Sequence, residues 1–152
     1  MKKYWLMKSD AGDYEIDDLK RDGKTPWFGV RNFQARNHMR DDMGIGDMVL
    51  FYHSDGKPSG VAGIGKVSSV PYPDFSQFDK KGKYYEPRAT KEKPVWFLVD
   101  ISFVKKFKRI ISIAELRVTP KLKNMIMLRP GNRLSITPVS KGEFKTLEKL
   151  GV

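Results

Sequence analysis

One short stretch, residues 25–40, concentrates the side chains that could recognise another molecule. It reads TPWFGVRNFQARNHMR and holds three aromatic residues, three arginines, two asparagines and one histidine. Aromatic rings stack on unpaired bases, and Arg and Asn side chains form paired hydrogen bonds with base edges. The same residues also fit a buried connecting helix with solvated arginines, so both interpretations remain open at this point.

The local pattern predicts a helix over residues 30–39 with an irregular entry, because Gly29 disfavours an earlier start. Its apolar residues fall on two opposite sides, which is typical of a helix wedged into a domain. Asn32, Arg36 and Arg40 share the polar edge between those sides. We therefore expect this edge at the mouth of a crevice.

Residues suited to catalysis are sparse in this chain. Cysteine is absent, and His38 and His53 are the only histidines. The usual metalloprotease, P-loop, serine-hydrolase and dinucleotide-binding motifs are missing. Ser54 directly follows His53, so the two need not converge as nucleophile and base, and Asp41-Asp42 is more typical of a solvated turn than of a metal site. We expect no enzyme, no catalytic residue, no metal and no cofactor.

The composition favours a polyanionic partner. The chain of 152 residues carries 29 Lys and Arg against 18 Asp and Glu, a formal charge of +11. Nucleic acid is the first expectation, an anionic membrane surface the second, and a basic surface without a partner the alternative. No segment approaches the roughly 20 apolar residues of a membrane span, and no signal peptide is recognisable. We expect no membrane partner and a cytoplasmic, nucleoid or nuclear location.

Aromatic and basic residues interleave in three places: residues 25–40, 51–53 and 103–109. Such interleaving suits a platform that binds unpaired bases. We expect Phe33 and Phe51 to be core residues. Trp27 lies beside Pro26 and Gly29 at the end of an element, and we expect it to serve in binding rather than in the core.

Two lysine clusters are candidates for a phosphate track. The preferred one, within residues 105–108, follows the strongest strand signal of the chain. The alternative, within residues 80–83, lies in a long loop expected over residues 71–94. Loss of the phosphate contacts of either cluster is expected to weaken binding to all nucleic-acid sequences alike, since phosphates carry no sequence information.

Hydrophobic runs and turn residues divide the chain into short strands and helices. Strands are expected over residues 4–8, 48–52, 61–70, 95–107 and 134–137. Helices are expected over residues 16–20, 30–39, 112–116 and 140–150. Interior glycines at positions 63 and 65 predict a bulge or bend. Consecutive strands do not suit a doubly wound parallel sheet, so we predict one α+β domain over residues 1–152, with a bent, mixed or barrel-like sheet and flanking helices.

Nine segments carry a more specific pattern: YWLMKS (4–9), IDDL (16–19), WFGVRN (27–32), ARNHMR (35–40), GDMVLFYHS (46–54), KYY (83–85), VD (99–100), FKR (107–109) and RLS (133–135). In them the chain resembles the EVE domain family, the relatives of thymocyte nuclear protein in the wider PUA-like group. The resemblance covers nearly the whole chain. It implies a small bent PUA-like β-barrel flanked by helices, and recognition of a modified base that is lifted out of a nucleic acid into a pocket.

YTH domains, which read N6-methyladenine, are similar but carry a cage tryptophan directly after a Gly-Val pair. This chain has Arg31 there, so a modified cytosine is at least as compatible as a modified adenine. The expected binding residues are Lys8, Ser9, Trp27, Arg31, Asn32, Arg36, Asn37, Tyr52, His53, Ser54, Arg133 and Ser135. The aromatic members would stack on the base, the Asn, His and Ser members would read its edge, and the basic members would hold phosphates or close the pocket. We expect that pocket where residues 27–40 meet the end of the strand at 48–52.

The sequence thus predicts a non-catalytic module that binds DNA or RNA and reads a modified base. An RNA-processing or nucleotide-acting enzyme on the same barrel is the first alternative. A protein-interaction domain with an incidental positive charge is the second.

Overall fold

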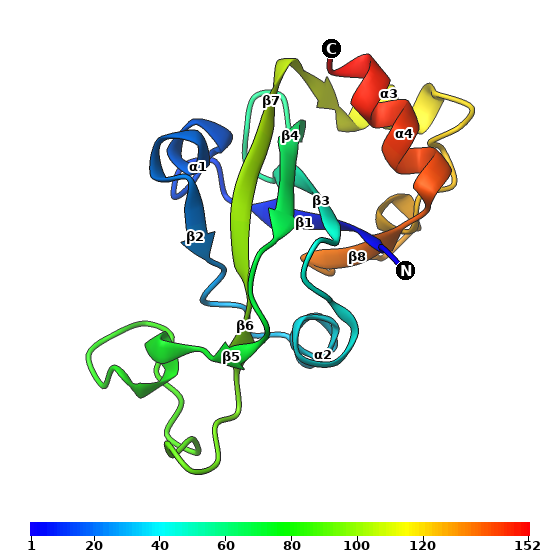
Figure 1. The fold of residues 1–152 in the computed structure, drawn as a ribbon. Helices are drawn as coiled ribbons and strands as arrows, with labels where there is room; N and C mark the ends of the chain where they lie inside the picture. The colour runs from blue at the N-terminus through cyan, green and yellow to red at the C-terminus, as the bar shows by residue number, and fades with distance from the viewer.

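The computed structural model describes residues Met1–Val152 and is built around one six-stranded sheet, with a two-stranded ribbon beside it (Figure 1). The strands are β1 (Tyr4–Ser9), β2 (Lys24–Pro26), β3 (Met48–His53), β4 (Gly60–Val67), β5 (Tyr72–Pro73), β6 (Phe97–Leu98), β7 (Asp100–Ser112) and β8 (Ile136–Val139). The helices are α1 (Ile16–Asp22), α2 (Phe33–Asn37), α3 (Ile113–Val118) and α4 (Lys141–Leu150). Shorter turns are the π-helical η1 (His38–Asp42) and the 3-10 turns η2 (Phe75–Phe78) and η3 (Ile126–Leu128). No helix has the length and apolar composition that a membrane crossing requires.

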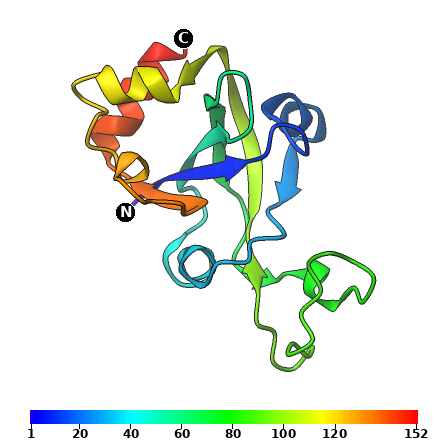
Figure 2. The ribbon, with the colours of Figure 1, turned by 180° about the vertical axis from the view of Figure 1, so that it is seen from behind.

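The large sheet is mixed, with the strand order β2-β7-β4-β3-β1-β8. β1 and β3 run parallel, and every other neighbouring pair in the sheet is antiparallel. Helix α1 lies on one side of the sheet, and helices α3 and α4 lie on the other, as Figures 1 and 2 show from opposite directions. The predicted α+β fold class, a bent mixed sheet with short flanking helices, is confirmed.

Both faces of the central strands are buried, because apolar residues occupy successive positions. In β3, Val49 and Phe51 belong to one core cluster, while Leu50 and Tyr52 belong to a second. The first cluster includes residues of α1 and of residues 27–43, and the second includes residues of α3 and α4. The sheet is therefore a partition between two cores, and the segment expected to bind lies on the side of the first.

The predicted irregularity in the strand at 61–70 is present in β4. Its register with β7 shifts between Val61 and Gly63 and again between Ile64 and Gly65. A Cβ at Gly63 would lie within 3 Å of the Ile16 side chain. The glycines thus bend the sheet and let α1 pack closely on it.

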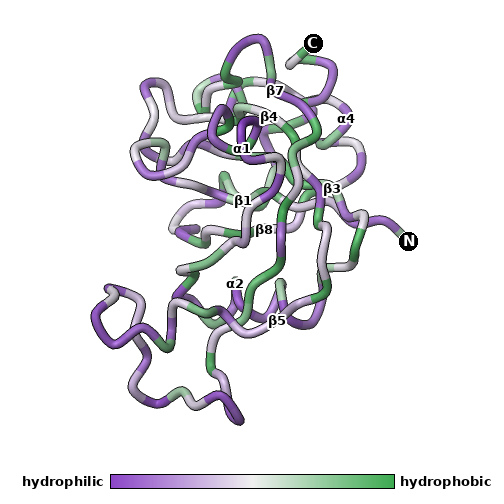
Figure 3. Tube along the Cα trace, turned by 60° about the vertical axis from the view of Figure 1, so that its left-hand side comes forward, coloured by the Kyte–Doolittle hydropathy of each residue, from purple (hydrophilic) through white to green (hydrophobic).

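We call the six-stranded sheet with its flanking helices the barrel. Residues 74–96, between β5 and β6, form an excursion that we call the arm, and the arm extends away from the barrel in Figures 1 and 2. Much of the arm is hydrophilic, in contrast to the strands (Figure 3). Its fold depends on Gln77, which is fully buried. The Gln77 amide donates to the carbonyls of Asp74 and Trp96 (2.8 and 2.7 Å) and accepts from the amides of Val95 and Trp96 (2.9 Å each). The segment predicted as a long loop over residues 71–94 is therefore an ordered substructure with its own polar centre.

Several elements differ from the predicted ones by a few residues, such as β4 and β8, and three differences are larger. The helix expected over residues 30–39 is shorter, because the Asn32 side chain caps it by accepting from the Ala35 amide at 3.0 Å. The strand expected over residues 95–107 is divided into β6 and β7, with Val99 between them. Strand β2 was not predicted, since it has only three residues and ends in Pro26.

Candidate functional site

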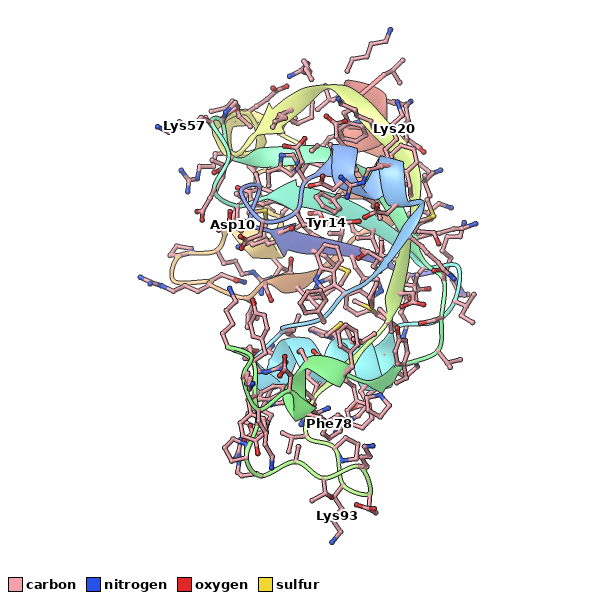
Figure 4. The ribbon with its side chains drawn as sticks, turned by 90° about the vertical axis from the view of Figure 1, so that its left-hand side faces the viewer. Asp10, Tyr14, Lys20, Lys57, Phe78 and Lys93 are labelled. Carbon is pink, nitrogen blue, oxygen red and sulfur yellow. The ribbon has the colours of Figure 1, made fainter.

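A cavity of about 380 Å³ opens where the barrel meets the arm. This volume falls in the range of small-molecule sites. Figure 4 looks onto this side of the molecule, with Asp10 and Tyr14 on the barrel and Phe78 on the arm. The lining residues are Lys8, Ser9, Asp10, Asp13, Tyr14, Thr25, Pro26, Trp27, Phe28, Gly29, Val30, Arg31, Tyr84 and Ser135.

Trp27 lies at the inner wall of this cavity and in the first core cluster at once. Only 8 % of its surface is exposed, and its ring meets Phe51 edge-on at 5.6 Å between centroids. Its backbone amide donates to the carbonyl of Val99 at 3.0 Å, which continues the pairing of β2 with β7. The expectation that Trp27 serves in binding rather than in the core therefore needs correction, because the residue is part of the core and also faces the cavity.

The indole N–H of Trp27 differs from those of the other two tryptophans. Trp5 donates through Nε1 to Asp47 Oδ2, and Trp96 donates through Nε1 to Glu86 Oε1, each at 3.0 Å. Trp27 Nε1 has no hydrogen-bond partner in the protein, yet it is not among the fully enclosed unpaired atoms. It is consequently a donor without a partner in the protein, on a residue that lines the cavity.

A hydrogen-bond network around Asp74 and Arg31, which we call the Asp74–Arg31 network, joins the outer wall of the cavity to the arm. The buried carboxylate of Asp74 accepts from the Gly29 amide (2.8 Å), from Arg31 Nη1 (3.1 Å) and from the amide and hydroxyl of Ser76 (2.8 and 2.5 Å). Arg31 also donates to the carbonyl of Val30 at 2.9 Å, to Ser76 Oγ at 3.1 Å and to the carbonyl of Tyr84 at 2.7 Å. Arg31 thus closes the wall of the cavity, since both of its Nη groups are already engaged within the protein.

The Arg31 guanidinium also lies between two aromatic rings, 5.2 Å from the centroid of Tyr84 and 5.1 Å from that of Trp96. Tyr84 in turn lies against Gly29, whose φ of +85° is accessible to glycine at little cost. A Cβ at position 29 would come within 2.8 Å of the Tyr84 ring. Residue 29 therefore lets the arm approach the cavity more closely than any side chain would allow.

The opposite wall is formed by the end of β1 and the loop that follows it. Ser9 Oγ donates to the carbonyl of Tyr14 at 2.6 Å, and the Tyr14 hydroxyl donates to Asp22 at 2.9 Å. Lys8 lies at the edge of the cavity with its Nζ 5.9 Å from the centroid of the Tyr52 ring, and burial lowers the pKa of its ammonium group. This wall supplies one partly buried cation and a set of polar groups that are already hydrogen-bonded.

Two residues expected in the pocket support this wall from behind. His53 is buried, and its Nε2 accepts from the backbone amide of Ile16 at 3.1 Å. Burial lowers the pKa of His53, which keeps the ring neutral and able to accept at neutral pH. Ser54 donates from both its amide and its hydroxyl to the carbonyl of Ser9, at 2.9 and 3.2 Å. These contacts fix the loop between β1 and α1.

The structure brings five of the twelve expected residues to the cavity: Lys8, Ser9, Trp27, Arg31 and Ser135. The other seven lie elsewhere: Asn32, Arg36, Asn37, Tyr52, His53, Ser54 and Arg133. The strand beside the cavity is therefore β1, not its parallel neighbour β3 as we expected.

Three of these seven residues have structural partners at α2. Asn32 caps the helix. Arg36 donates to the carbonyl of Val95 at 2.7 Å and to the Asn37 side chain, which also accepts from Arg40. Together these contacts attach α2 to the arm, and none of the three side chains reaches the cavity.

Phe33, also in α2, was expected to be a core residue, and this expectation is wrong. Its side chain is 48 % exposed and stacks on Trp96 at 4.8 Å between centroids, whereas Phe51 is buried as expected.

Tyr52 and Arg133 occupy two further environments. Tyr52 belongs to the second core, and burial raises the pKa of its hydroxyl. Arg133 is exposed, two residues before the cavity residue Ser135.

Sequence reasoning missed the contribution of the loop between β1 and α1 and of the arm. Asp10, Asp13 and Tyr14 lie in a polar segment that carries no signal beyond a turn. Tyr84 lies 55 residues from Gly29 in sequence, so no local pattern joins them. The only signal was the KYY segment, which belongs to the family resemblance but was not assigned to the site.

Comparison with known proteins shows extended similarity. The family model of the EVE domain matches residues 3–150. Human thymocyte nuclear protein 1 is 39% identical over 163 aligned residues, which cover 95% of this chain and 72% of that protein. A hypothetical protein from Leishmania major superimposes with a TM-score of 0.93 at 42% identity, covering 99% of this chain and 95% of that one. The human THYN1 protein in complex with 5-methylcytosine-containing DNA superimposes with a TM-score of 0.88 at 37% identity, covering 99% and 98%.

Proposed function

Because this chain belongs to the EVE domain family, we propose that it is a non-catalytic module that binds DNA and takes a 5-methylcytosine into the cavity beside Trp27. The observation that carries the proposal is the cavity itself, a space of about 380 Å³ that is lined by Trp27, whose indole N–H has no partner in the protein. The choice of modification is supported by the human relative, which was crystallised with 5-methylcytosine-containing DNA.

The physical requirements for such a reader match features of this chain. Extruding a base from a duplex costs a few kcal/mol, which contacts in the pocket must recover. An aromatic wall and a free donor provide stacking and a hydrogen bond for that purpose. The net charge of +11 provides attraction to phosphates, independent of sequence. The name thymocyte nuclear protein, carried by the relatives, supports a location in which the chain meets DNA.

Discrimination between cytosine and 5-methylcytosine needs more than burial of a methyl group. Burying one methyl contributes about 0.8 kcal/mol, which corresponds to about a fourfold preference. A larger preference requires walls that cannot relax around the unmodified base. The Asp74–Arg31 network supports such rigidity, because its seven hydrogen bonds hold the Gly29 backbone and Tyr84 in place.

The non-catalytic role is supported by the engagement of the polar groups in the cavity. Ser9 directs its hydroxyl proton to a backbone carbonyl, which is no general base, and burial raises the pKa of Tyr14, so neither hydroxyl is activated as a nucleophile would be. The alternative of a nucleotide-acting enzyme rests on Lys8, whose pKa is lowered by burial at the cavity edge. Chromatography of a modified oligonucleotide after incubation with the protein distinguishes the two, since a reader returns it unchanged.

The direct test is fluorescence anisotropy with two short duplexes that differ only by one 5-methyl group. We expect tighter binding to the methylated duplex, by more than the fourfold that methyl burial alone supplies, at every salt concentration. Affinity for both duplexes should fall as salt rises, because phosphate contacts release counterions. Equal affinity for the two duplexes would contradict the proposal, and salt-independent binding would favour a protein-interaction domain.

A further inference from the structure

Two aromatic rings lie exposed and in contact beside the mouth of the cavity. Phe28 is 48 % exposed and Phe75 is 52 % exposed, and their ring centroids are 5.4 Å apart. Tyr84 meets Phe28 edge-on at 6.1 Å. Large apolar residues exposed singly are ordinary, but a contiguous exposed group marks an interaction surface. We call these three residues the aromatic patch.

The aromatic patch is continuous with the cavity. Phe28 and Tyr84 line the cavity, while Phe75 does not and so extends the same surface outward onto the arm. A base that enters the cavity must therefore pass beside Phe28. The group next to it along a nucleic acid chain comes to lie over the outer part of the aromatic patch.

The rings stand on a backbone that is held rigidly. Asp74 caps η2 by accepting from the Ser76 amide at 2.8 Å, and its other oxygen accepts from the Gly29 amide at 2.8 Å. Phe75 and Phe28, each adjacent in sequence to one end of this bridge, are fixed relative to each other. Such preorganisation lowers the entropy that binding must overcome.

The charge next to the aromatic patch fits a polyanion. Lys80, Lys81 and Lys83 are exposed, and none of them is in an ion pair. Lys83 Nζ lies 5.0 Å from the centroid of the Tyr84 ring. The preferred phosphate track at residues 105–108 is less available, since Lys106 pairs with Asp17 at 2.7 Å. Cations beside exposed rings are the combination that binds a sugar-phosphate chain with its bases.

We propose that the aromatic patch is a second base site, in which Phe75 and Phe28 cover the neighbour of the base held in the cavity. This inference rests on the proposed function of the cavity. When a base leaves a duplex, the faces of its neighbours are uncovered, and this lost stacking opposes extrusion. An aromatic ring placed against such a face replaces part of the lost stacking, as apolar wedges do in proteins that unstack base steps. The aromatic patch then favours extrusion of any base, while the cavity selects the modified one.

The test is Phe75→Ala, measured by anisotropy with the methylated and unmethylated duplexes. We expect affinity for both to fall by about tenfold, the loss of one stacked base. The ratio between the two affinities should stay at the wild-type value, because Phe75 does not line the cavity. Phe75→Tyr should restore binding. The matched control is Phe33→Ala, which removes a ring of similar exposure (48 % against 52 % for Phe75) that stacks on Trp96 outside the cavity, and which should leave both affinities unchanged.

A second pair of substrates tests the contact itself. Duplexes with an abasic site on one or the other side of the 5-methylcytosine lack one neighbouring base face. On one of them, wild type and Phe75→Ala should bind equally, while the difference persists on the other. Unchanged affinity of Phe75→Ala, or the same loss on both abasic substrates, would overturn the proposal. Failure of the cavity proposal is seen separately, as a wild-type protein without preference for the methylated duplex.

Discussion

Trp27→Ala is expected to lower the free energy of unfolding by about 3–5 kcal/mol, the cost of deleting a large buried ring. The structural reason is that Trp27 is 8 % exposed and packs against Phe51 in the first core cluster. Urea denaturation followed by circular dichroism measures this loss directly. A variant as stable as the wild type would show that the Trp27 ring lines the cavity but does not contribute to the stability of the core.

The binding role of Trp27 is separated from its core role by a milder pair of variants. Trp27→Phe keeps an aromatic ring, but its smaller size loosens the cavity wall and its free indole donor is lost. We therefore expect a modest loss of stability, and a clear loss of preference for the methylated duplex because the wall can relax around the unmodified base. Trp5→Phe is the matched control, because Trp5 is equally buried and its indole donates to Asp47 away from the cavity. It should lose stability and keep the preference. Loss of preference in both variants would mean that stability alone governs binding.

Gly29→Ala is expected to destabilise the protein by more than its backbone conformation accounts for. A φ of +85° costs a residue with a side chain about 1–2 kcal/mol. The added Cβ would also lie 2.8 Å from the Tyr84 ring, and such overpacking adds about 1–3 kcal/mol. The same displacement of Tyr84 changes the cavity wall, so the affinity for methylated DNA should fall as well.

Gly46→Ala controls for the backbone term alone. Gly46 has a φ of +95°, and a Cβ there would meet nothing within 4 Å. We expect a stability loss of about 1–2 kcal/mol in denaturant titrations and no change in DNA affinity. Equal losses of stability in the two variants would show that Tyr84 yields freely and that the arm is not held against the cavity.

The elements of the barrel were largely predictable because their signals are local. The apolar run at residues 48–52 predicts a buried strand, observed as β3, and the capping box at Ser140 and Glu143 marks the start of α4, where both of its hydrogen bonds form. The glycines within β4 likewise predicted the irregularity that the structure shows as shifts in register. In each case the residues that determine the structure lie within a few positions of one another.

The cavity was only partly predictable because its walls are joined over long sequence separations. The partners of Arg31 in the arm lie 43 to 53 residues away, so its side chain could not be assigned to closing the wall rather than to a phosphate. Trp27 could not be recognised as a core residue, since its pairing to Val99 depends on the unpredicted strand β2. The polar residues of α2 fitted base recognition by type, and their actual partners are the helix and the arm.

Entry of a modified base into the cavity beside Trp27 can be observed at the indole itself. The indole N–H resonances in ¹H–¹⁵N correlation spectra report on this step, since the chain has three tryptophans and each gives one such resonance. Trp5 and Trp96 donate to carboxylates within the protein, whereas Trp27 has a free donor at the cavity. On titration with the methylated duplex, we expect the Trp27 indole resonance to shift strongly while those of Trp5 and Trp96 stay in place. A Trp27 resonance that does not move when the protein is saturated with methylated DNA would show that no base enters the cavity beside Trp27.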